Sequence, residues 1–319
     1  MKPLVTIAIP TYNRAGNYLP QALASAINQT YANIEIIVSD NCSTDNTESV
    51  VKRFRDKRIR YIRQQKNIGS YNNSNFCLEQ ANGEYFLLLF DDDQVDSEFV
   101  EACINTLEDQ ESVGVVLTGA REIDGASNIL FECPNQGAGL SMDETFLAWF
   151  KGKVPLYLCS TLYNTRRLCE LGGLHSKTYM YEDVIAEFKL AKMFGRKIVP
   201  EVKASYRRHD HNMGSSVSIK DWCEDSLYLL DIICDLASEN KAFIRSEGLR
   251  YFCRRNYKRA ARLKSPINRV LAYLFVFKAF QYKRFPPFFN NPIKPNIFIR
   301  GLRFLKRRLS AKLEFSKIN

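Results

Sequence analysis

The sequence predicts an α/β protein with a mostly parallel sheet flanked by helices, followed by a helical, basic C-terminal region. Over the first 120 residues, short apolar and β-branched runs alternate with segments of helical spacing, a pattern typical of βαβ units. The polar clusters fall where the apolar runs end, and parallel sheets bind their ligands at the carboxyl ends of strands. After about residue 215 the pattern turns helical and aromatic, and from Arg250 it is strongly basic.

Each expected element follows from its local pattern. LVTIAI at 4–9 is a β-branched run closed by Pro10, and Ser43 or Thr44 can cap a helix that runs through Phe54. The strands are expected at 4–9, 34–38, 58–62, 85–90 and 113–117, and the helices at 19–28, 44–54, 74–80 and 99–107. Further along, we expect loop with one short helix at 131–152, strands at 157–162 and 197–206, and a helix at 182–194. The change of pattern predicts a domain boundary near 215.

Composition narrows the class of protein. The chain has 319 residues, of which 45% are hydrophobic and 25% charged, as expected for a globular protein with a sizeable core. Nine scattered cysteines without a CxxC pair indicate free thiols in a reducing compartment and argue against a zinc site or a disulfide scaffold. The N-terminus shows no signal-peptide pattern, and the longest apolar run, 270–277, is far shorter than the ~20 residues that span a bilayer.

The net charge of +10 is unevenly distributed. Residues 250–319 contain 19 of the 45 Lys and Arg residues but a single acid, Glu314. The first 249 residues therefore hold 26 basic and 34 acidic residues. Such asymmetry indicates a basic appendage that meets an anionic surface.

The stretch FLLLFDDDQ (86–94) runs from a buried strand directly into Asp91, Asp92 and Asp93. Three adjacent carboxylates repel one another, and each prefers to stay solvated. They suit Mg²⁺ or Mn²⁺, which usually take one or two protein carboxylates and leave the other positions to water and phosphate. They also suit a solvated acidic turn at the start of the next helix.

Other polar residues are expected at the same edge of the sheet. Thr11, Asn13 and Arg14 follow the first strand, and Asp40 and Asn41 end the second. Each alone is typical of a turn or a cap. Together they would line one crevice large enough for a nucleotide, with Arg14 on a phosphate and Asp40 on a base or ribose.

Two later clusters carry further candidates. Glu182 and Asp183 stand at the start of a predicted helix, where a carboxylate either caps the helix or acts as a base toward a hydroxyl. YRRHDHNMGSS places His209 and His211 beside two arginines in a loop after a strand, which suits a diphosphate or metal contact.

These motifs, in this order, resemble glycosyltransferase family 2, the inverting nucleotide-sugar transferases of GT-A fold. The residues that carry the resemblance are VTIAIPTYNR (5–14), SAINQTY (25–31), IEIIVSDNCSTDNT (34–47), NIG (67–69), NGEYFLLLFDDD (82–93), LGG and YED (171–183) and YRRH (206–209). They span about residues 4 to 214. The resemblance implies a catalytic domain at 1–215, with nucleotide-sugar binding in 1–120 and the acceptor and base region in 121–215, and a separate region at 216–319.

The resemblance also implies roles for single residues. The base that activates the acceptor hydroxyl would be Asp183. The nucleotide sugar would be bound by Pro10, Thr11, Tyr12, Arg14, Asp40, Asn41, Asn67, Asp91 and Arg208, and the metal, Mg²⁺ or Mn²⁺, by Asp92, Asp93 and His209. Many members have paired aspartates where this chain has Asp40 and Asn41, and an aspartate where it has Phe90. The resemblance therefore assigns metal binding mainly to Asp92.

The expected function is transfer of a sugar from a nucleotide-diphosphate donor, a UDP-sugar, to a hydroxyl of a glycan or lipid-linked acceptor in bacterial surface polysaccharide synthesis. Two other interpretations stay open. LLLFDDDQV also fits a haloacid-dehalogenase-like phosphatase with Asp91 as nucleophile, Asp93 as acid/base and Thr118 as a later motif residue. The third is a non-catalytic protein that binds through its tail.

The basic tail interleaves Lys and Arg with Phe, Tyr, Leu and Ile. If residues 297–309 are helical, their apolar side chains fall mostly along one side, as in helices that lie in an anionic membrane interface. Packing on the catalytic domain and binding of nucleic acid are the alternatives, of which nucleic acid is not expected. These features predict a cytoplasmic protein, peripheral on the inner face of the plasma membrane.

Overall fold

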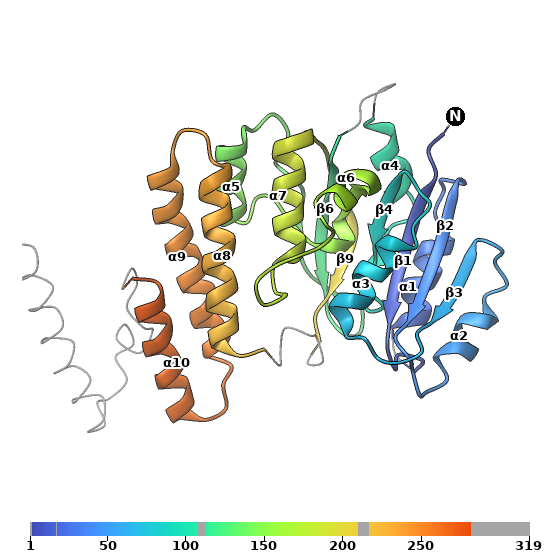
Figure 1. Ribbon diagram of the computed structural model, residues 1–319, viewed down its shortest axis with the longest axis horizontal. Helices are drawn as coiled ribbons and strands as arrows, with labels where there is room; N and C mark the ends of the chain where they lie inside the picture. Colours follow the sequence, from blue (N-terminus) through green and yellow to red (C-terminus); the bar gives the residue numbers. More distant parts are fainter. Residues whose placement is uncertain (1, 17, 108–112, 210–216, 282–319) are drawn as a thin grey trace, which may run out of the picture. The chain divides into compact units, whose positions relative to one another are not determined.

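A computed structural model describes residues 2–16, 18–107, 113–209 and 217–281 of the chain (Figure 1). The chain divides into two compact units, Met1–Gly248 and Leu249–Asn319. The boundary near 215 that composition suggests lies inside the first unit. As a division between a catalytic and a membrane-associating region, it stays a prediction.

The first unit is built on a nine-stranded sheet with the order β3-β2-β1-β4-β8-β6-β9-β5 and with β7 paired to β6. The strands are β1 (Val5–Thr11), β2 (Ile34–Asp40), β3 (Ile59–Arg63), β4 (Tyr85–Leu88), β5 (Gln94–Val95), β6 (Val115–Ile123), β7 (Ile129–Cys133), β8 (Thr161–Asn164) and β9 (Arg196–Arg207). The first four strands are parallel to one another, and β6 is parallel to β9. Strand β8 runs antiparallel between β4 and β6 and joins the two parallel parts.

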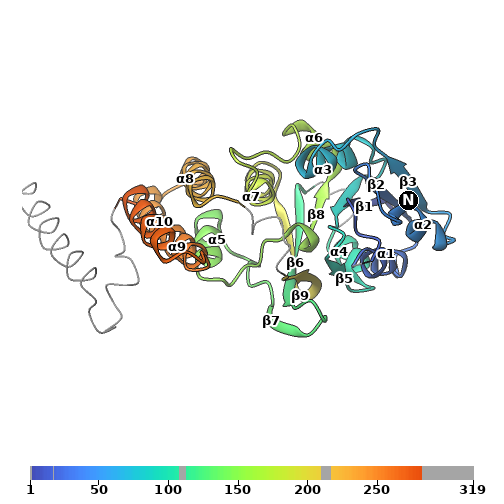
Figure 2. The same cartoon turned by 90° about the horizontal axis from the view of Figure 1, so that it is seen from below.

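Helices cover both faces of the sheet. They are α1 (Leu19–Ile27), α2 (Thr47–Arg53), α3 (Ser70–Glu79), α4 (Phe99–Asn105), α5 (Met142–Phe150), α6 (Thr165–Glu170), α7 (Glu182–Phe194) and α8 (Ile219–Leu236), with a 3-10 turn η1 (Leu158–Ser160). Helices α3 and α6 lie on one face, and α1 and α4 on the other (Figure 2). β1 is buried along its whole length, as a strand covered on both faces must be. The predicted α/β class is confirmed.

The structure differs from the sequence-based expectations mainly after residue 120. A strand, β7, lies in the stretch expected to be loop with one short helix, and η1 replaces the first half of the strand expected at 157–162. The two-residue strand β5 and the short helix α6 were not expected. Elements this short carry too little pattern to be recognised from sequence.

The second unit begins within α9 (Lys241–Ala260), and α10 (Pro266–Ala279) follows. The side chain of Ser265 caps α10 by accepting a hydrogen bond from Asn268 N at 3.3 Å. Helix α10 buries Tyr273, Val276 and Phe277. Within the described part of the chain, no helix combines the length and apolar character needed to cross a bilayer. The amphipathic helix predicted at 297–309 lies outside the described residues.

Candidate functional site

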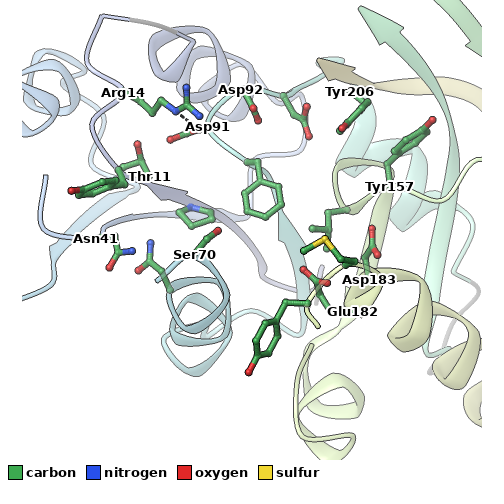
Figure 3. A pocket seen from close by; sticks show the side chains of 18 of the residues that line it. Thr11, Arg14, Asn41, Ser70, Asp91, Asp92, Tyr157, Glu182, Asp183 and Tyr206 are labelled. Atoms are coloured by element: carbon green, nitrogen blue, oxygen red, sulfur yellow. Dashed lines mark ion pairs between the residues drawn. The ribbon is translucent and has the colours of Figure 1, made fainter. Parts of the chain in front are cut away.

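A cavity of about 430 Å³ opens at the carboxyl ends of the parallel strands, a volume usual for small-molecule sites. It is lined by Pro10, Thr11, Tyr12, Arg14, Asn41, Ser70, Asn73, Phe90, Asp91, Asp92, Asp93, Tyr157, Leu158, Tyr179, Met180, Glu182, Asp183, Tyr206 and Trp222. Figure 3 shows Arg14, Asp91 and Asp92 on one side and Glu182 and Asp183 on the other. We call the first side, with Thr11 and Asn41, the strand end of the cavity. We call the second side, with Tyr179, Met180 and Trp222, the helix end of the cavity.

Strand register builds the strand end. Thr11 pairs with Asp40 across β1 and β2, so the two strands finish together. Ala8 of β1 pairs with Leu88 of β4, and the Leu89 amide donates to the carbonyl of Ala8 at 2.9 Å. Strand β4 ends at Leu88, three residues before Asp91. Motifs 80 residues apart in the sequence therefore meet at one edge of the sheet, as the sequence predicts.

Asp91 is buried beside a cation. Arg14 Nε lies 3.7 Å from Asp91 Oδ1. Burial raises the pKa of Asp91 to about 7, and the charge of Asp92 adds to this, whereas the Thr11 hydroxyl and Arg14 oppose it. A carboxyl with a pKa perturbed by both burial and a charged neighbour, inside a cavity, is typical of a functional site.

Asp92 and Asp93 are held by the end of β9. His209 Nε2 lies 2.9 Å from Asp92 Oδ2, and both side chains are mostly buried. Asp93 Oδ1 accepts a hydrogen bond from the Arg207 amide at 2.8 Å. Burial and the charge of Asp92 raise the pKa of Asp93 well above its ordinary value. Asp92 and His209 thus meet across 117 residues, and the structure brings these two predicted metal ligands together.

The donor set at the strand end suits a hard divalent ion. Asp92 supplies a carboxylate oxygen and His209 a ring nitrogen. In the described residues, no three His, Cys, Asp or Glu side chains converge on a point that would hold a metal ion. Mg²⁺ is usually held by one or two carboxylates and completed by substrate phosphates and water, and the Asp92 carboxylate meets that requirement.

Arg207 was not expected as a key residue, yet among the described residues it is the largest fully buried side chain. Its guanidinium donates to Asp92 O at 2.8 Å, to Asp124 O at 3.0 Å and to Gln21 Oε1 at 2.9 Å. It also lies over the ring of Tyr18 at 4.3 Å. The sequence shows two adjacent arginines, and only burial distinguishes Arg207 from exposed Arg208.

At the helix end, the first turn of α7 presents two carboxylates. Glu182 and Asp183 follow the N-cap Tyr181, where the helix dipole favours negative charge. Asp183 Oδ1 accepts a hydrogen bond from the Val184 amide at 2.8 Å. Burial, then the charges of Asp183 and Asp225, raise the pKa of Glu182 to about 8. Burial at this position therefore favours the protonated form of Glu182.

A third carboxyl, Glu187, lies one turn further along α7 and is fully buried. Its Oε1 accepts hydrogen bonds from the hydroxyls of Thr161 and Tyr163. Burial and the charge of Asp183 raise the pKa of Glu187 well above its ordinary value. The helix end is therefore acidic in composition but carries less charge than three carboxylates would.

Four predicted site residues do not line the cavity. Asp40 is buried, and its carboxylate accepts hydrogen bonds from the Ser43 amide at 2.8 Å and from the Tyr61 hydroxyl. Asn67 Oδ1 accepts from Asn41 Nδ2 at 3.0 Å. Arg208 pairs with Glu122 at 3.1 Å, and His209 stands behind Asp92. Their binding roles stay predictions, as do those of the lining residues, and His211 lies outside the described residues.

No sequence pattern indicated several of the lining residues. The rings of Tyr157 and Tyr206 stack at 4.8 Å and 15°, although Tyr157 precedes η1 and Tyr206 lies in β9. Trp222 belongs to α8, beyond the predicted boundary near 215. Tyr179 and Met180 lie in the turn before α7, between motifs that were recognised.

The phosphatase interpretation does not agree with this geometry. Thr118 is fully buried, and its hydroxyl donates to the carbonyls of Gly119 and Ser160. Thr118 does not line the cavity. Asp93, the acid/base of that interpretation, is held by the Arg207 amide.

Residues 6–133 match the glycosyl transferase family 2 model. A Campylobacter jejuni relative, GalNAc(5)-diNAcBac-PP-undecaprenol beta-1,3-glucosyltransferase, is 31% identical over 176 residues, which cover 53% of this chain and 55% of the relative. The chain spans less than two thirds of the length of the curated relatives it matches.

Two solved structures share the fold. Residues 1–349 of S. aureus TarS superpose with a TM-score of 0.64 at 19% identity, covering 88% of this chain and 80% of that chain. The mannosyltransferase PcManGT from Pyrobaculum calidifontis, in complex with GDP-Man and Mn²⁺, gives 0.52 at 19% identity, covering 88% and 83%. The motifs, the sheet order and these matches agree: residues 6–133 are similar to glycosyl transferase family 2, and the chain has the GT-A fold.

Proposed function

We propose that the chain is an inverting, metal-dependent glycosyltransferase that moves a sugar from a nucleotide diphosphate, a UDP-sugar, to a hydroxyl of a glycan or lipid-linked acceptor. One observation carries the proposal. A single cavity presents Asp91 and Asp92 beside Arg14 at its strand end and Asp183 at its helix end. Charge-binding groups and a base thus face one space from opposite sides.

The strand end suits the nucleotide. Thr11, Tyr12 and Asn41 line it beside Arg14, whose guanidinium can turn from Asp91 to a phosphate oxygen. Asp92 and His209 would hold the divalent ion, with Asp93 behind them. That ion, Mg²⁺ or Mn²⁺, supplies Lewis-acid neutralisation of the leaving diphosphate.

The helix end suits the acceptor. Asp183 would accept the proton of the acceptor hydroxyl as that oxygen forms its bond to the anomeric carbon. The bond from the anomeric carbon to the diphosphate oxygen breaks on the opposite side, so the nucleoside diphosphate leaves and the anomeric centre inverts. Protonated Glu182 keeps a second negative charge away from Asp183, which favours attack by an electron-rich oxygen.

A donor screen tests the proposal. Purified chain is incubated with UDP-, GDP- and dTDP-sugars and Mn²⁺, and release of nucleoside diphosphate is measured with and without EDTA. We expect turnover with one nucleotide class, strongest for UDP, and its loss with EDTA. If no nucleotide sugar is turned over and no nucleoside diphosphate raises the melting temperature, the non-catalytic interpretation replaces this one.

We further propose that the basic second unit places the enzyme on the inner face of the plasma membrane, for synthesis of a surface polysaccharide such as lipopolysaccharide or capsule. In α10, Ile267 and Leu271 are 70% and 59% exposed, and Leu274 and Phe275 are also exposed. These positions form one stripe at helical spacing, next to a strongly basic composition. Co-sedimentation with phosphatidylserine vesicles should be strong and decrease with salt. Salt-sensitive binding to nucleic acid without vesicle binding would contradict the proposal.

A further inference from the structure

The segment that leads into α7 forms one wall of the helix end. Gly172 and Gly173 end α6 with φ of +85° and +87°, a conformation that glycine adopts without strain. Residues 174–181 then run past α3 and α8 to the first turn of α7. Tyr179 and Met180 of this segment line the cavity next to Glu182 and Asp183. We call residues 174–181 the α7 approach loop.

The α7 approach loop is attached at both of its ends. At its start, Asn75 of α3 accepts a hydrogen bond from Leu174 N at 2.9 Å and donates to Leu174 O at 3.1 Å. At its end, the anchor is Asp225 of α8, a fully buried residue.

The Asp225 carboxylate accepts four hydrogen bonds from this one loop. Oδ1 accepts from Lys177 N at 2.8 Å and from Thr178 N at 3.0 Å. Oδ2 accepts from Met180 N at 2.7 Å and from the Ser176 hydroxyl at 2.8 Å. Removing this buried carboxylate would leave the four loop donors without their hydrogen-bond acceptor, at a large cost in free energy. The Asp225 carboxylate therefore fixes the path of the loop.

The anchored residues flank Tyr179, which has a positive φ of +62°. A bulky residue rarely adopts this conformation, and it persists where the surroundings hold it in place. The amides of Thr178 and Met180, on either side of Tyr179, both donate to Asp225. The Tyr179 ring packs on Tyr71 of α3 at 4.2 Å between centroids. Asp225 therefore holds Tyr179 in place as part of the cavity wall.

Asp225 shares its helix face with Trp222, which lines the cavity. Trp222 lies three positions earlier on α8, so the two side chains leave the same side of the helix. Trp222 lines the cavity and meets the Tyr181 ring edge to face at 5.6 Å. A single face of α8 thus supplies one aromatic side chain to the cavity and holds the loop that supplies another.

We propose that Asp225 is a positioning residue for acceptor binding: it holds the α7 approach loop so that Tyr179 and Met180, together with Trp222, present an apolar wall to a sugar ring of the acceptor beside Asp183. Aromatic faces suit the C–H face of a pyranose, while its hydroxyls stay available for hydrogen bonding. The inference rests on the proposed transferase function and deepens it. It assigns the acceptor wall to α8, which lies outside the part of the chain that matches the family.

A matched control exists in the same unit. Asp143 of α5 is also buried, and its carboxylate accepts hydrogen bonds from the amides of Ser238, Glu239 and Asn240 at 2.9 to 3.1 Å. It anchors the turn after α8, and none of these four residues lines the cavity. Asp143 and Asp225 are therefore similar anchors, of which only one holds a cavity loop.

The experiment compares D225A, D225N and D143A with the wild type, using a donor that the wild type turns over. The acceptor probes are octyl β-D-glucopyranoside, octyl β-D-galactopyranoside and octyl N-acetyl-β-D-glucosaminide. Hydrolysis of the donor by water reports the strand end, and the acceptor KM reports the helix end. Hydrogen exchange at residues 176–180 reports the loop itself.

We expect D225A to raise the acceptor KM at least tenfold and to speed hydrogen exchange at 176–180, with donor hydrolysis within twofold of the wild type. D225N keeps one acceptor oxygen for Lys177 and Thr178, so its effect should be intermediate. D143A should lower the melting temperature and leave the acceptor KM within twofold. If D225A does not fold, D225N gives the decisive comparison.

Three results would overturn the inference. One is an unchanged acceptor KM in a folded Asp225 variant. Another is an equal rise of KM in D143A, because the effect would then be general loosening. The third is parallel loss of donor hydrolysis in D225N, because Asp225 would then support the whole site. A wild type that binds no nucleotide sugar overturns the proposed function first, and the inference with it.

Discussion

The two ends of the cavity are built in different ways. The strand end comes from loops that follow β1, β2 and β4, and each contributing motif is short and local. The helix end comes from α7, α8 and the α7 approach loop, which meet through side chains far apart in the sequence. Parallel strands align their carboxyl ends by backbone pairing alone. Helices and loops need particular side-chain contacts, and Asp225 supplies several of them.

The two ends also manage negative charge differently. At the strand end, Asp91 lies next to Arg14, and a bound cation would add to this compensation. At the helix end, the charges that act on Glu182 and Glu187 come from neighbouring carboxylates, and burial raises the pKa of both. We infer that the strand end is prepared for an anionic ligand with its metal, and the helix end for a neutral hydroxyl. Four substitutions test this contrast.

The largest effect is expected for D183N at the helix end. Loss of a general base lowers a rate by ~10²–10⁴-fold, so kcat for transfer should fall in that range. Donor affinity, measured by thermal shift with nucleoside diphosphate and Mn²⁺, should stay within threefold. The control is E182Q, which removes the neighbouring carboxyl and should keep kcat within tenfold. A reversal of these two results would make Glu182 the base.

D92N should act at the strand end instead. Removing a carboxylate ligand should weaken Mn²⁺-dependent donor binding and lower kcat/KM by ~10²-fold at fixed Mn²⁺. Titration of activity with Mn²⁺ should show a shift to higher concentrations. The control is D56N, which removes an aspartate paired with Arg58 away from the cavity and should leave the titration unchanged. An unshifted titration for D92N would assign the metal to other residues.

R207M should reduce stability and disturb the strand end. Its guanidinium satisfies buried acceptors on three segments, and leaving such groups unpaired costs about 3 kcal/mol. We expect a decrease of that size in the free energy of unfolding, measured with urea. R208M removes an exposed arginine and should change the free energy by less than ~0.5 kcal/mol. Equal effects of the two substitutions would contradict the role given to Arg207.

The smallest effect concerns pH and Glu182. Its pKa is raised from the ordinary 4.5 to about 8 in the folded chain. The unfolded chain therefore loses this proton first, and stability falls as pH rises from about 4.5 to 8. The slope is at most about 1.4 kcal/mol per pH unit. E182Q should reduce the decrease in melting temperature between pH 5.5 and pH 8. An unchanged decrease would show that Glu182 is charged throughout this range.

Sequence patterns predicted the first half of the fold better than the second. The first four parallel strands follow runs of apolar residues, and their predicted positions agree with the structure to within a few residues. The two-residue strand β5 exists because Gln94 and Val95 pair with Ser205 and Ala204 of β9. Strand β8 joins two parallel parts in the antiparallel sense. A single strand's pattern carries no information on its partner.

By itself, the sequence determined the α/β class, the family resemblance and the strand-end residues, because short motifs at strand ends are brought together by backbone pairing. It also identified Asp183 as the candidate base. Only the tertiary structure decided which neighbouring residues face the cavity. Burial separates Arg207 from Arg208, and long-range hydrogen bonds give Asp225 its place. Side-chain burial and contacts across 45 or more residues depend on the packed chain, so no local pattern contains them.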